Sequence, residues 1–383
     1  MNLKIFEVFT FCCLGLSVFR CGKYSASPVG ADVFQGQNPD MERRVTFYAA
    51  PSDTSYRIPV VCGASPYLFV GDDRGLESWT YIVFDTATTS GSLVKATLSF
   101  TVLPYPESDA SPVEISILPT ESPWDEGTMT WDTKISPASE TPLFREQASL
   151  SEDTTRIDLD VPLELAAALV SKDTSVERTG LLIRAEGTGG FIRLFSREFS
   201  TSSPLIPHLT LITESDTMTV MPRKDTFVSN SARTVPPDRL WIQDGTADRI
   251  LMRFNVSGIP PEATVNRARL VLHTDAESAF PAPTSAFYLS AVPLADSVWT
   301  LPGVATDSTW IASGAASGDS IATILTSWVQ KWTSGTAPNC GLMLKGTLEN
   351  TDLAGRSVFS SSADSVRIPR LEIFYSIPPT GRY

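Results

Sequence analysis

The pattern of apolar and polar residues predicts many short β-strands along this chain. Residues 96–102 alternate apolar and polar side chains with a period of two, and residues 113–118 and 156–161 do the same, as strands with one buried face do. Shorter apolar runs at residues 67–70 and 80–84 also indicate strands. Only residues 163–170 combine good helix formers with helical spacing, so the first half is expected to hold one short helix.

The second half of the chain repeats this order. Three short strings of the first half recur in the second half in the same order. Gly180 corresponds to Gly341, Phe195 to Phe359 and Pro207 to Pro369, at offsets of 161, 164 and 162 residues. Residues 321–329 stand where the first half has its short helix. A repeat of about 160 residues is a whole domain rather than a solenoid unit. We therefore expect two tandem domains, at residues 45–213 and 219–377.

Many short strands, one short helix per repeat and 28 prolines predict an all-β fold with two tandem jelly-roll-type β-sandwich domains. A doubly wound α/β fold would need helices between most strands, and the pattern lacks them. The net charge of −13, without any run of Lys or Arg, disfavours binding to nucleic acid, because an acidic surface repels phosphate backbones.

The first 21 residues resemble a bacterial lipoprotein signal peptide. An interrupted apolar stretch at residues 5–19 is too short to span a bilayer comfortably and ends just before Cys21. Lipidation of Cys21 would leave residues 22–44 as a flexible tether and would hold the protein on the outer membrane or cell surface by a lipid anchor alone. Arg20, in a place usually held by a small residue, keeps open ordinary cleavage near residues 25–27 and release outside the cell.

Several strings carry a family resemblance. They are residues 225–228, 250–260, 339–342 and 369–373 in the second repeat and residues 122–132 in the first. Together they resemble the DNRLRE, or disaggregatase-related repeat, domain, which is similar to carbohydrate-binding module family 96. The resemblance implies a jelly-roll sandwich, an extracellular setting and a role beside enzymes that act on polysaccharides.

Sugar binding in such a fold needs aromatic side chains with polar neighbours. Trp124, Trp131, Trp299 and Trp310 lie in the long connections of the repeats, and Asp125 and Glu126 lie between the first two. These six residues form the expected ligand site, and packing in the core is the alternative interpretation for the tryptophans. Trp328 and Trp332 are four residues apart, so they share a helix face and are expected in the core.

The expected partner is a polysaccharide or a component of the cell envelope, and the protein is expected to be non-catalytic. Two alternatives stay open: a structural spacer of the envelope, and a lyase or glycosidase that uses Asp125 and Glu126. No cofactor is expected, because His208 and His273 lie far apart in the sequence. No disulfide framework is expected either, because Cys62 and Cys340 fall at non-matching positions of different repeats. The oxygen-rich loop at residues 71–73 could bind calcium, but it has no EF-hand spacing, so the sequence favours a plain turn there.

Overall fold

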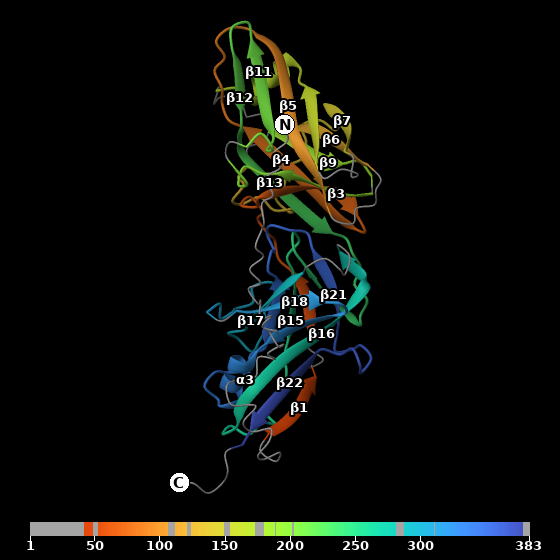
Figure 1. Cartoon of the computed structure of the whole chain (residues 1–383), viewed down its shortest axis with the longest axis vertical. Helices are drawn as coiled ribbons and strands as arrows, with labels where there is room; N and C mark the ends of the chain where they lie inside the picture. Colours follow the sequence, from red (N-terminus) through yellow and green to blue (C-terminus); the bar gives the residue numbers. More distant parts are fainter. Residues whose placement is uncertain are drawn as a thin grey trace, which may run out of the picture.

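The computed structural model describes residues 42–48, 53–105, 112–120, 124–148, 154–172, 180–187, 189–200, 203–280, 287–309 and 311–377. These residues form two β domains stacked end to end (Figure 1). The predicted signal peptide, Cys21 and residues 22–41 of the predicted tether lie outside the described residues, as does Trp310.

The first domain is a continuous hydrogen-bonded sheet of 11 strands around one apolar core. The strand order is β12-β11-β5-β10-β3-β4-β9-β6-β7, with β13 beside β4 and β8 beside β5. The strands are β3 (Tyr67–Asp73), β4 (Leu76–Phe84), β5 (Leu93–Pro104), β6 (Val113–Thr120), β7 (Phe144–Ala148), β8 (Thr155–Asp160), β9 (Gly180–Ala185), β10 (Gly190–Phe195), β11 (His208–Thr213), β12 (Thr217–Val220) and β13 (Pro222–Ser231).

The second domain also has an 11-stranded sheet, in the order β1-β22-β16-β19-β18-β17-β20-β15-β14-β21, with β2 beside β15. A further pairing of β16 with β21 closes this sheet around its core. The strands are β1 (Glu42–Tyr48), β2 (Thr54–Arg57), β14 (Arg239–Gln243), β15 (Asp248–Met252), β16 (Thr264–Phe280), β17 (Tyr288–Pro293), β18 (Ala312–Ser317), β19 (Ser320–Ile324), β20 (Leu342–Gly346), β21 (Gly355–Phe359) and β22 (Arg370–Ser376).

The predicted all-β sandwich class is confirmed, and the period-two pattern explains how the cores form. On β5, Leu98, Phe100 and Val102 point into the first core, each about 1% exposed. On β6, Ile115 and Ile117 face the same core. Successive side chains of a strand point to opposite faces, so each alternating stretch buries one complete apolar row.

The two helices among the described residues follow the prediction in one repeat and depart from it in the other. Helix α2 (Leu163–Leu169) lies where the sequence predicts it. In the second repeat, residues 321–324 belong to strand β19, and helix α3 starts only at Thr326 and ends at Thr333. Ile321 and Thr323 are β-branched and buried on alternate positions, so this stretch completes the ladder with β16 instead. Neither helix has the length and apolarity to span a membrane.

The two sheets share most of their strand pairings, which supports a duplicated domain, and one difference is that β18 pairs with β19 whereas β7 and β8 do not pair. The β4–β9, β3–β10 and β5–β11 pairs of the first domain correspond to β15–β20, β14–β21 and β16–β22 of the second. In the same comparison, β12 corresponds to β1, because β12 pairs with β11 and β1 pairs with β22, the last strand of each repeat. β13 corresponds to β2, because β13 pairs with β4 and β2 pairs with the equivalent strand β15.

The domains exchange these strands. The couple β1–β2 precedes the first domain in the sequence but completes the sheet of the second, and β12–β13, which precedes β14, completes the sheet of the first. The expected boundaries at residues 45–213 and 219–377 therefore do not follow the strand pairings. By pairing, the first domain spans residues 67–231, and the second combines residues 42–57 with 239–376.

An aromatic cluster fills the junction between the domains, and we call it the junction core. Its buried members are Cys62, Phe69, Leu76, Tyr105, Phe191, Phe227, Phe280 and Leu353. Phe280 from β16 of the second domain stacks on Tyr105 of the first, with ring centroids 5.7 Å apart and planes 19° from parallel. The phenol of Tyr105 donates to Asp352 Oδ1 of the second domain at 2.8 Å. The junction is thus packed like a domain interior rather than hinged.

Candidate functional site

The segment that begins at Trp124 folds back onto the first domain. Trp124 is 8% exposed, and its ring meets Tyr81 edge-on at 6.0 Å. Lys224 of β13 donates to the Trp124 carbonyl at 2.6 Å and so fixes the backbone there. The indole Nε1 of Trp124 is buried and has no hydrogen-bond partner among the described residues. The prediction that Trp124 offers an open face to a sugar is wrong, because β13 and Tyr81 cover it.

The two acids that follow Trp124 have separate structural roles. Asp125 is exposed, and its Oδ1 accepts the Gly127 amide at 2.9 Å, which builds a local turn. Glu126 forms an ion pair with Arg197 at 2.9 Å and accepts the Asp225 amide at 3.3 Å. The two carboxylates therefore do not face each other across an open site.

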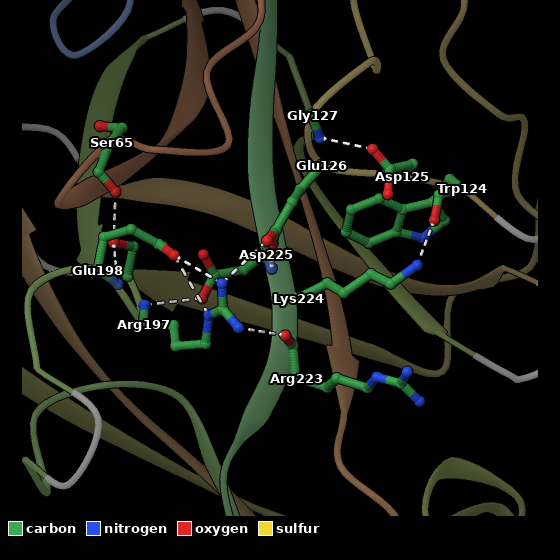
Figure 2. A network of polar contacts seen from close by, with 11 residues as sticks. Ser65, Trp124, Asp125, Glu126, Gly127, Arg197, Glu198, Arg223, Lys224 and Asp225 are labelled. Carbon is green, nitrogen blue, oxygen red and sulfur yellow. Dashed lines mark hydrogen bonds and ion pairs between the residues drawn. The ribbon is translucent and has the colours of Figure 1, made fainter.

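Figure 2 shows a polar network in which Arg197 gathers Glu126, Glu198 and Asp225. Glu198 pairs with the Arg197 guanidinium at 2.9 Å, and the Arg197 amide donates to Asp225 Oδ2 at 2.9 Å. Asp225 is completely buried, and burial raises its pKa to about 8. Burial also raises the pKa of Glu126, opposed by the nearby Arg197 guanidinium. A carboxyl that is protonated at neutral pH can share a hydrogen bond with a neighbouring carboxylate.

Trp131 lies further along the same connection, between β6 and β7. Its half-buried ring packs against Trp79 at 5.2 Å with an interplanar angle of 59°. Lys134 Nζ lies 3.9 Å from the Trp131 ring centroid, within cation–π range. Trp131 also lines a cleft of about 270 Å³ together with Arg57 and Asn230. Trp131 therefore reaches a cleft, whereas Trp124 is buried.

Trp299 is half-buried against the second domain. Its Nε1 donates to the Cys340 carbonyl at 3.1 Å, and the Arg253 guanidinium lies 5.3 Å from its ring. A cluster around Leu251 and Met343 packs beneath it. Its polar atom is already bonded and one face is already packed, so little of the ring is left for a ligand.

Three clefts lie in a row at the domain junction, and we call them together the junction groove. The first, of about 390 Å³, lies beside Arg74, Arg233 and Trp241. The second, of about 200 Å³, shares Arg233 and Trp241 with the first and Arg57 with the third, which is the Trp131 cleft. β2, the end of β13 and residues 233–236 form its walls, so the exchanged strands create it.

Arg57 is the central cation of the junction groove. Its guanidinium binds the Asp248 carboxylate through two bonds of 3.0 and 3.2 Å. Its Nη1 also donates to Asn230 Oδ1 at 3.2 Å and to the Ser231 carbonyl at 2.9 Å. Burial raises the pKa of Asp248 despite this pairing. The pair holds the end of β2 against β15, and the bonds to Asn230 and Ser231 hold it against β13.

A second cation, Arg233, is held by aromatic rings rather than by a carboxylate. Its guanidinium lies 4.6 Å from the Trp241 ring and 5.4 Å from the Phe280 ring, and its Nε donates to the Arg74 carbonyl at 2.9 Å. Burial, together with the charge of Arg74, lowers the pKa of Arg233 to about 10. Arg233 therefore presents oriented N–H donors toward the first cleft of the groove.

A separate cleft of about 420 Å³, the α3 cleft, lies in the second domain beside helix α3. Trp328, Trp332, Leu294 and Pro338 supply most of its apolar wall. Trp328 is 5% exposed and confirms its predicted place in the core, whereas Trp332 is only half-buried. The rule that residues four apart share a helix face predicted their proximity but not the opening beside Trp332.

The groove residues that sequence reasoning missed come from segments far apart in the chain. Arg57, Arg233 and Trp241 carry no common motif, and only strand exchange brings them together. Within the described ranges, no group of three or more His, Cys, Asp or Glu side chains is placed to hold a metal ion. In the calcium candidate at residues 71–73, the Asp73 carboxylate pairs instead with Arg74 at 2.9 Å.

No protein-family model and no curated protein matches the chain, so the DNRLRE resemblance stays a prediction. Among solved structures, the tandem family 22 carbohydrate-binding modules of Paenibacillus barcinonensis Xyn10C are 8% identical, with 90% of this chain and 95% of that chain covered and a TM-score of 0.19. The C-terminal domain of the AgI/II polypeptide BspA from Streptococcus agalactiae is 8% identical, with 86% and 92% covered and a TM-score of 0.17. The tandem CBM51 modules of a family 98 glycoside hydrolase from Streptococcus pneumoniae are 9% identical, with 80% and 82% covered and a TM-score of 0.13. Scores this low assign no family.

Proposed function

We propose that this chain is a non-catalytic surface protein that binds a polysaccharide in the junction groove. The observation that supports this most is the row of three clefts with shared walls between the two domains. A row of connected subsites suits an extended polymer better than a compact ligand, because successive sugar units can occupy successive clefts.

The groove offers the two kinds of contact that sugars use. Trp131 and Tyr56 are half-exposed aromatic side chains on its walls, and their rings can pack against pyranose faces. Asn230 and Thr246 line the third cleft, and Arg233 supplies N–H donors in the first two. Hydroxyl groups of a glycan would bond with these polar groups.

The surface location is part of this proposal and rests on the lipoprotein-like sequence that ends at Cys21. Glu42 at the start of β1 pairs with Ser376 near the end of β22, so the first and the last described strands lie side by side in the second domain (Figure 1). Along the chain, an anchor at Cys21 would therefore be nearest to the second domain.

A second candidate function is that of a rigid spacer in the cell envelope. The junction core favours it, because Phe280, Tyr105 and Phe191 lock the two domains into one elongated body. In this case the junction groove would be a by-product of strand exchange and would bind no glycan.

A screen of residues 40–383 on an array of polysaccharides separates the two functions. We expect saturable binding to at least one polymer, and we expect Trp131→Ala to weaken it by about tenfold, which corresponds to about 1.4 kcal/mol. Trp332→Ala is the matched control, since it removes an indole from the α3 cleft and should leave binding unchanged. Absence of saturable binding to every polymer would favour the spacer, and loss with Trp332→Ala alone would move the site to the α3 cleft.

A further inference from the structure

The second domain receives two of its strands from a segment that does not belong to its continuous part. β1 and β2 reach it from residues 42–57, and residues 58–66 then carry the chain across the junction to β3. Within the described chain, β1 pairs with β22 alone and β2 pairs with β15 alone. Both strands can therefore leave without breaking any pairing between the other strands.

The core of the second domain depends little on these strands. Val45 and Phe47 of β1 are only partly buried and pack on the outside of a core built by other strands. The equivalent couple in the first domain differs, because Phe227 and Val228 of β13 are at most 1% exposed. The second domain thus keeps its own core when β1 and β2 leave, whereas the first domain would lose part of its interior.

Departure of β1 would expose the backbone of β22 from Arg370 to Ser376 as an unpaired edge. Such an edge is a template for another strand, and the strand that fits it in register and side-chain pattern is β1 itself. A second copy of this chain carries the same strand. Exchange of an identical element between copies costs little, because the contacts in the closed and the exchanged forms are the same.

We propose that the second domain is a strand acceptor, and that the β1–β2 segment of one copy can complete the second domain of another copy and link the two chains. Side-chain contacts at both ends of β2 oppose the release of the segment. Arg57 holds Asp248 with two bonds at one end, and Asp53 accepts the Ser361 amide at 2.6 Å at the other. The short connection gives the intramolecular strand an effective concentration on the order of 1 mM, so exchange needs chain concentrations that approach this value.

Exchange of the β1–β2 segment between two chains can be trapped by a disulfide bond. The two cysteines are placed at residues that lie opposite each other in the β1–β22 pairing. Thr46 lies opposite Glu372, and the Cα atoms of such partners are about 4.5–5.5 Å apart, within disulfide range. One preparation of residues 40–383 carries T46C and another carries E372C. They are mixed, refolded together at about 0.1–1 mM chain and oxidised. The native Cys62 and Cys340 are buried and stay the same in every variant.

We expect the mixture to give a disulfide-linked dimer whose yield rises with chain concentration, and Arg57→Ala to raise that yield several-fold. T46C mixed with R370C, which is two residues out of register, should give none. A single chain that carries both T46C and E372C should close internally, which checks the register. The proposal fails if the double variant closes internally while the mixture forms no dimer at any concentration, and it also fails if the double variant does not close.

Discussion

Phe227 offers the sharpest test of strand exchange, because its place in the sequence and its place in the fold disagree. By sequence it opens the second repeat, but in the structure it lies on β13 beside β4 of the first domain. Its side chain is fully buried and meets Phe69 edge-on at 4.9 Å. Truncation of a buried Phe to Ala costs about 3–5 kcal/mol, and the lost aromatic pair favours the upper part of that range.

We expect Phe227→Ala to lower the melting temperature of the first domain by on the order of 10 °C. Hydrogen exchange followed by mass spectrometry should show faster exchange in β3 and β4, with β15 little changed. Phe254→Ala is the matched control: Phe254 is 1% exposed in the core of the second domain, so its loss should loosen β15 instead. Faster exchange in β14 and β15 with β4 intact after Phe227→Ala would refute the exchange of strands.

Two further substitutions probe the first domain. The pKa of Asp225 is raised to about 8 in the folded state, whereas an unfolded chain releases this proton near pH 4. Asp225 therefore destabilises the folded protein increasingly as the pH rises from about 4 to about 8. Asp225→Asn should therefore raise the melting temperature more at pH 8 than at pH 5, and an equal change at both pH values would show that Asp225 is ionised when buried. Trp124→Phe removes a buried N–H without a partner among the described residues, which offsets the lost ring volume, so the unfolding free energy should change by less than about 1 kcal/mol. It should also leave polysaccharide binding intact, and a loss of binding would place Trp124 against the ligand.

The sequence was most informative where structure is decided locally. Alternation at residues 96–102 and 113–118 predicts β5 and β6 because a strand buries every second side chain. The same reasoning works for α2, whose alanine-rich stretch has little competition from a neighbouring strand. At residues 321–324 it fails, because pairing with β16 overrides the helical spacing.

Strand exchange could not be predicted from the pattern. The two repeats are similar, so the sequence pattern alone does not assign a couple of strands to one sheet or the other. The choice depends on packing at the junction, where Phe227 meets Phe69 and Phe280 meets Tyr105. These contacts join residues more than 150 positions apart, and no local window contains them.

The residues of the junction groove could not all be predicted from the sequence, because they also come together through contacts between distant segments. Placing Trp124 and Trp131 in one connection identified a region next to the groove, but burial of Trp124 depends on Lys224 and Tyr81 from other strands. The groove itself is built from β2, β13 and β14, which only the exchanged topology brings together.

The central claim is that a polysaccharide occupies the junction groove, and a footprint of the bound polymer tests it most directly. Hydrogen exchange of residues 40–383 would be compared with and without the polysaccharide selected by the array. We predict slower exchange at residues 55–60 and 229–235, on the walls of the groove, with helix α3 unchanged. Slower exchange at α3 alone, or the same exchange everywhere at saturating polymer, would contradict a ligand site at the junction.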